Sequence, residues 1–91
     1  MVVLDIGAGV GALVVTVSEE LCGRELEISP RGRPRARSHT VARRRHVPTG
    51  ALVAAVFPAV PVGDHDVWAP DGSWLGTVRV TSGQVTEMAT G

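Results

Sequence analysis

The chain has 91 residues, of which 44% are apolar, and nine basic residues balance nine acidic ones. This length predicts one domain over residues 1–91, and the zero net charge excludes a global attraction to nucleic acid or membrane surfaces. No apolar run approaches the ~20 residues of a membrane-spanning helix. The N terminus carries no signal-peptide pattern and Cys22 has no partner for an internal disulfide, so we expect a cytoplasmic protein.

Short β-prone runs separated by turn residues follow one another along the chain. They are residues 2–6, 13–17, 24–28, 36–46, 51–57, 64–69, 74–80 and 84–89, with room for one helical turn at 18–21. Leu26 and Ile28 alternate with Glu25 and Glu27, as in a strand with one buried face, and Ala51–Phe57 is apolar on both faces, as in a central strand. The pattern predicts an all-β antiparallel sandwich of about seven or eight strands.

For one hairpin, the sequence predicts which residues of the two strands pair with each other. Asp71-Gly72 predicts a two-residue type I′ turn. Pairing outward from it places Trp68 opposite Leu75, His65 opposite Val78 and Asp64 opposite Arg79. This register turns Trp74 inward and exposes Trp68 with Leu75 on the outer face. We interpret Trp68 and Leu75 as a candidate surface for a protein partner or for self-association; the alternative is that another segment covers them.

Seven of the nine arginines lie between positions 31 and 45. One interpretation is a polyanion-binding or nucleic-acid-binding patch, with the candidate residues Arg37, Arg43, Arg44 and Arg45. No aromatic residue interleaves with these arginines, although single-strand binding usually requires base stacking. The other interpretation is a solvated loop followed by a strand in which Arg43 and Arg45 face Glu25 and Glu27.

No pattern for catalysis or metal binding stands out. His39, His46 and His65 have no ligand spacing typical of a metal site, and alternation along a strand points His65 away from Asp64 and Asp66. We interpret His65 as a packed or rim residue. Cys22 has no neighbouring histidine, and no serine has a nucleophile-elbow pattern. We therefore predict no catalytic, metal-binding or cofactor-binding residues.

The segment VLDIGAGVGALVV, from Val3 to Val15, resembles the first glycine-rich loop of S-adenosylmethionine-dependent methyltransferases. Glu27 lies about 20 residues after Asp5, where that family carries its acidic ribose ligand. The resemblance implies S-adenosylmethionine as the cofactor.

The residues after these glycines oppose that interpretation. ALVVTVS is rich in β-branched residues, which disfavour the helix that a cofactor loop requires, and no alternation of strands and helices follows. We therefore predict a strand over Leu13–Val17 and a turn formed by Gly7, Gly9 and Gly11. A methyltransferase-like fragment remains the second alternative for the function.

From Val56 to Met88 the sequence VFPAVPVGDHDVWAPDGSWLGTVRVTSGQVTEM is similar to the second half of transthyretin-like sandwiches, the carboxypeptidase regulatory-type and Cna-B-type domains. Phe57, Val60, Pro61 and Gly63 match that family's order, and His65 stands where it usually has Tyr. The resemblance implies a domain that is non-catalytic. Cna-B isopeptide crosslinks need Lys and Asn, and the chain has neither.

Together these observations predict a non-enzymatic binding or assembly module that works with a protein partner or as a homo-oligomer. A polyanion-binding or nucleic-acid-binding protein is the first alternative. We expect no membrane association.

Overall fold

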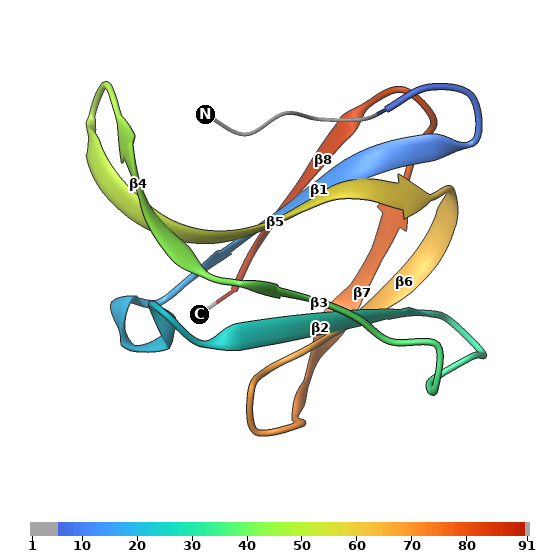
Figure 1. The fold of residues 1–91 in the computed structure, drawn as a ribbon, viewed down its shortest axis with the longest axis horizontal. Coiled ribbons are helices and arrows are strands. Elements are labelled where there is room, and N and C mark those ends of the chain that lie inside the picture. The colour runs from blue at the N-terminus through green and yellow to red at the C-terminus, as the bar shows by residue number, and fades with distance from the viewer. Residues whose placement is uncertain (1–5, 91) are drawn as a thin grey trace.

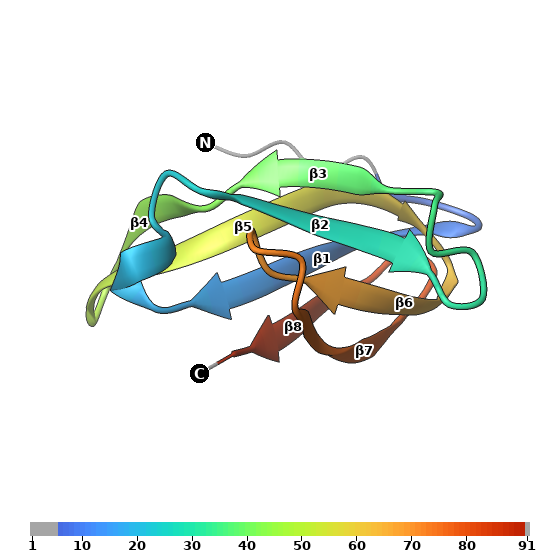
Figure 2. The same cartoon turned by 90° about the horizontal axis from the view of Figure 1, so that it is seen from below.

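The protein is an all-β sandwich of two four-stranded sheets, as predicted (Figures 1 and 2). The computed structural model describes residues 6–90. Most of the expected first run, including Asp5, therefore lies outside the described residues.

Two sheets contain all the described strands. Sheet A has the order β4-β5-β1-β8 and sheet B the order β3-β2-β6-β7. The strands are β1 (Val10–Val17), β2 (Glu25–Pro30), β3 (Ser38–Val41), β4 (Arg43–Val47), β5 (Gly50–Pro61), β6 (Gly63–Trp68), β7 (Trp74–Val80) and β8 (Val85–Ala89), with a 3-10 turn at Glu19–Leu21. Adjacent strands are antiparallel, as predicted, except β1 and β8, which pair in parallel.

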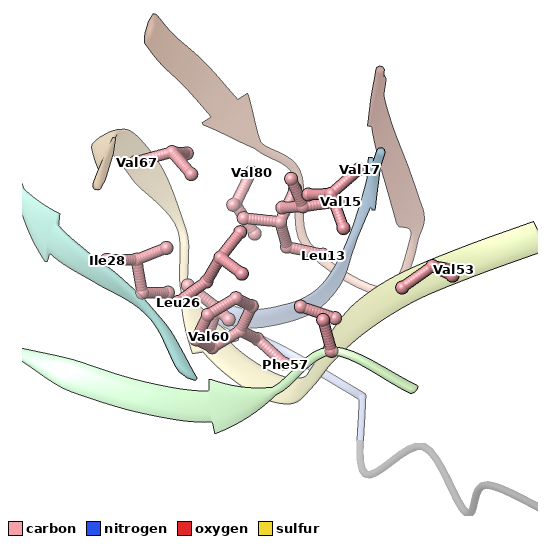
Figure 3. Packing of buried hydrophobic residues seen from close by; sticks show 12 residues of the cluster. Leu13, Val15, Val17, Leu26, Ile28, Val53, Phe57, Val60, Val67 and Val80 are labelled. Carbon is pink, nitrogen blue, oxygen red and sulfur yellow. The ribbon is translucent and has the colours of Figure 1, made fainter. Parts of the chain in front are cut away.

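The core lies between the sheets and consists mainly of branched aliphatic side chains (Figure 3). In β1, Leu13, Val15 and Val17 are buried, so the predicted strand over these residues is confirmed. Phe57 joins them from β5, which has neighbours on both sides, as its two apolar faces predicted. The β-branched residues that disfavour a helix after the glycines therefore fill the sandwich.

The glycine-rich segment before β1 forms a tight turn. The backbone groups of Gly7 and Val10 bond each other, and Gly9 has a φ of +79°. Ser82 lies against this turn, because its Oγ accepts the Gly9 N–H at 3.0 Å and donates to the Gly7 carbonyl at 2.9 Å. The Gly9 N–H therefore already donates a hydrogen bond to the β7–β8 loop. After the turn the chain continues as strand β1, whereas a cofactor loop would be followed by a helix.

The long polar run predicted as one strand is divided between the two sheets. The chain passes from β3 in sheet B to β4 in sheet A at Ala42, which is fully buried. As a result Arg43 and Arg45 pair with β5, and the predicted pairing with Glu25 and Glu27 is wrong. The residues opposite these glutamates on β3 are Val41 and His39.

In the hairpin of β6 and β7, three residues lie between the last paired residues Ala69 and Ser73, one more than the predicted two-residue turn. The Ala69 N–H donates to the Ser73 carbonyl at 2.8 Å and the Gly72 N–H donates to the Ala69 carbonyl at 2.9 Å. Gly72 has a φ of +88°, and no described non-glycine residue has a positive φ. Asp71 therefore cannot begin a type I′ turn. Pro70 fits the first central position of a type I turn, with Gly72 as the left-handed residue after it.

The extra loop residue shifts the register at the end of this hairpin. The pairs farther from the loop are as predicted, His65 with Val78 and Asp64 with Arg79. Beyond Val67 the register slips, so that Trp68 pairs with Trp74. A slip of one residue exchanges the faces of a sheet: Trp74 is exposed and Leu75 packs against the core. The predicted outer pair of Trp68 with Leu75, and the inward Trp74, are therefore wrong.

Candidate functional site

The outer face of sheet B gathers both tryptophans of the chain. Leu26, Ile28 and Val67 point into the core, so the residues that alternate with them along β2 and β6 point outward. We call this surface the tryptophan face; it comprises Glu25, Glu27, Ser29, Arg37, His39, Asp64, Asp66, Trp68, Trp74, Thr77 and Arg79. Glu27, Trp68 and Trp74 form one cross-strand row on it.

Trp68 is half-buried and held from two sides. Its Nε1 donates to the Ser29 Oγ at 3.0 Å, and the Arg37 guanidinium carbon lies 4.1 Å from the ring centroid. This is the geometry of a cation–π contact. A nitrogen of the same guanidinium lies 3.5 Å from a Glu27 carboxylate oxygen. Arg37, predicted as a polyanion ligand, therefore already contacts an aromatic ring and a carboxylate within the chain.

Trp74 is 59% exposed, yet its indole is anchored. Its Nε1 donates to Asp66 Oδ1 at 3.1 Å, and the Thr77 hydroxyl donates to the same oxygen at 2.7 Å. The hydrogen bond from Thr77, with smaller contributions from Trp74 and the charges of Arg31 and Arg37, holds the pKa of Asp66 below its usual value, although burial opposes this shift. The carboxylate that orients Trp74 is therefore ionised at neutral pH.

The charged groups of the tryptophan face have partners within the face. Besides the contacts of Arg37 and Asp66, Arg79 lies 3.3 Å from Asp64, and the His39 ring lies 3.7 Å from Glu25. Exposed ion pairs of this kind contribute little to stability. The aromatic row therefore lies among side chains that already contact one another, with four carboxylates and two arginines on the face.

The four arginines proposed for polyanion binding do not share one surface. Arg37 lies just before β3 and contacts Trp68 and Glu27 of sheet B, whereas Arg43, Arg44 and Arg45 lie on the edge strand β4 of sheet A. Arg44 forms an ion pair with Glu19. Neighbouring residues of a strand point to opposite faces, so Arg44 also points away from the other two. The structure therefore divides the predicted patch.

Sequence reasoning missed Trp74 as a surface residue, although one signal was present. Pro70 precedes Asp71-Gly72, and its fixed φ favours the longer loop that turns Trp74 outward.

His65 is buried, as a packed histidine was predicted to be, and its Nε2 donates to the Pro61 carbonyl at 2.8 Å. Its Nδ1 has no hydrogen-bond partner among residues 6–90.

Across the described residues, no three His, Cys, Asp or Glu side chains come together in a way that could hold a metal ion. The same part of the chain contains no helix with the length and apolar character needed to cross a membrane. Comparison with family models, with curated proteins and with solved structures gave no match to this chain.

Proposed function

We propose that the chain is a non-enzymatic assembly module that binds a second copy of itself through the tryptophan face. The observation that carries this proposal is the exposed indole of Trp74, fixed by Asp66 beside the Arg37–Trp68 pair. Trp and Arg are the residue types that most often dominate the binding energy of protein interfaces. An aromatic side chain that is already oriented loses less conformational freedom on association.

The charges of this face favour a protein surface over a polyanion. Glu27 and Asp64 compensate Arg37 and Arg79, so the face offers no free row of cations for phosphates. Its four carboxylates also outnumber its two arginines, so the face as a whole does not attract phosphates. A chain of this size also has a small core and gains stability by burying further apolar surface. Association in the cytoplasm, as expected from the lone Cys22, is part of this proposal.

Sedimentation equilibrium over a range of concentrations tests the proposal. We expect the wild-type chain to approach the mass of a dimer and the Trp74→Glu variant to stay monomeric, because a buried, unpaired carboxylate opposes association. The control is Val85→Glu, which places the same charge on an exposed apolar residue of sheet A. This control should dimerise like the wild type.

Tryptophan fluorescence identifies the surface that is used, because both tryptophans lie on this face. Association should shift their emission and reduce quenching by acrylamide as the concentration rises. A wild-type chain that remains monomeric contradicts the proposal. So does a dimer that Trp74→Glu leaves intact, or one that forms without a change in tryptophan fluorescence.

A further inference from the structure

A pocket lies in the seam between the two sheets, on the side where the chain crosses at Ala42. Its volume is about 230 Å³, and it lies between β3 of sheet B and the end of β5 in sheet A. The walls are mostly apolar, with Ile28, Phe57 and Val60 among them. Ser38 and Thr40 supply hydroxyl groups, His39 and His65 also line it, and no Arg, Asp or Glu side chain does.

Strand β3 runs along this pocket with one edge unpaired in the described part of the chain. It pairs only with β2. The backbone groups of Ala42 bond Gly23 and Arg24 on the β2 side. Since these groups alternate in direction along an antiparallel strand, those of Thr40 and Ser38 also face β2. The N–H and C=O groups of His39 and Val41 therefore face away from the sheet.

The opposite wall of the pocket is a poorer template for pairing. Strand β5 pairs with β4 only as far as Ala54, so its later residues are open on that side. Pro58 and Pro61 lie in this stretch and have no N–H to donate. Of the two strands beside the pocket, β3 is the one with a full set of backbone donors and acceptors.

We propose that β3 and the seam pocket bind an extended segment of a partner protein, which adds to sheet B as a further strand. Peptides that bind in this way obtain affinity from main-chain hydrogen bonds and specificity from pockets for alternate side chains. In an added strand, residues opposite Thr40 and Ser38 point to the same face as these two side chains. That is the face of the pocket, whereas residues opposite His39 and Val41 point to the outer face.

The size and lining of the pocket define the inserted side chain. A cavity of about 150 Å³ holds a benzene ring, so about 230 Å³ accommodates a side chain such as Phe, Leu or Met. The apolar walls disfavour a carboxylate, because it would lose its hydration there and no Arg or Lys side chain lines the pocket to pair with it. The segment therefore carries a large apolar residue facing Thr40, within alternating outward polar residues. This site shares only His39 with the tryptophan face.

Backbone amide NMR with synthetic peptides tests the proposal. The probe is an acetylated and amidated hexapeptide of sequence TVTFTV. The matched control TVTDTV differs only in the side chain aimed at the pocket. We expect shifts of the amide signals of β3 and of Phe57, Ala59 and Val60. We also expect the Phe peptide to bind at least about tenfold more tightly than the Asp peptide, the factor that about 1.4 kcal/mol produces.

Two further comparisons separate strand addition from unspecific contact. N-methylation of the Thr residues removes the amides that face β3 and should abolish binding, whereas N-methylation of the apolar residues should leave it intact. The variant Ala59→Trp should weaken binding by filling the pocket, and Ala51→Trp, an exposed alanine of the same strand that does not line it, should not. Unshifted β3 amides, equal binding of both peptides, or equal effects of the two methylation patterns would overturn the proposal.

Discussion

Replacing Gly11 with alanine tests how the glycine-rich turn is joined to the rest of the sandwich. Gly11 is buried, and its φ does not lie in the left-handed region, so the backbone itself would accept a side chain. A Cβ atom at this position would contact the Thr81 carbonyl oxygen, and it would lie 2.8 Å from a Val80 methyl and 3.0 Å from the Gln84 carbonyl oxygen. Gly11→Ala is therefore expected to lower the free energy of unfolding through steric overlap with these neighbours and not through backbone strain.

The size of this effect follows from which atoms must move. Inserting one methyl group into a packed site typically costs about 1–3 kcal/mol. Two of the three neighbours are backbone oxygens of the β7–β8 loop, which cannot rotate away, so we expect about 3 kcal/mol. For a domain of this size that lowers Tm by roughly 12–24 °C.

Urea and thermal unfolding, followed by circular dichroism and tryptophan fluorescence, measure this loss. Gly7→Ala is the matched control, because a Cβ there meets no atom of residues 6–90 within 4 Å and no positive φ is involved. Its stability should stay within about 0.5 kcal/mol of the wild type. If Gly11→Ala and Gly7→Ala are equally stable, the β7–β8 loop does not pack on Gly11 as described.

Three further outcomes are expected. The pKa of Asp66 is lowered by folding, so its carboxylate stabilises the protein above the unfolded value of 3.8 and this contribution is lost as the pH falls through the folded pKa; the stability difference between wild type and Asp66→Asn, measured by urea unfolding, should therefore shrink below pH 3.8. Arg37→Ala removes the contact with Trp68 and should cost about 0.5–1 kcal/mol, with a red shift of tryptophan emission; unchanged emission would contradict that contact. Gly72→Ala should cost about 1 kcal/mol in thermal unfolding, because Gly72 has a left-handed φ in the β6–β7 loop, and no loss would contradict the three-residue loop.

Local patterns were sufficient to predict the elements that alternate in burial. The β-branched run after Gly11 predicted β1, and the alternation of Leu26 and Ile28 predicted the inward face of β2. In both strands one face is buried, so inward-pointing apolar residues recur at every second position of the sequence. The pairs of Asp64 and His65 with β7 were placed by counting from a two-residue turn, and they are correct because the register shift between Val67 and Trp68 offsets the extra loop residue.

Features that depend on distant parts of the chain were not predicted. The polar run around Arg43 shows no break in hydropathy, and only the small apolar Ala42 marks the point where the chain changes sheets. No local sequence pattern predicts the parallel pairing of Val14 with Glu87, because the residues of β1 and β8 do not by themselves determine which strand each one pairs with. The outward position of Trp74 depended on one extra loop residue, which changes the register between the loop and the shift next to Val67.

The parallel pairing of β1 with β8 affects how the protein can form during synthesis. Strand β1 leaves the ribosome early, but one of its two neighbours in sheet A is the last described strand. At about 5–20 residues per second, β1 exists for several seconds with an unpaired edge made of apolar and β-branched residues. Such an edge is a template for pairing with other chains. We therefore expect that nascent chains stalled before Val85 are the ones that aggregate or require a chaperone.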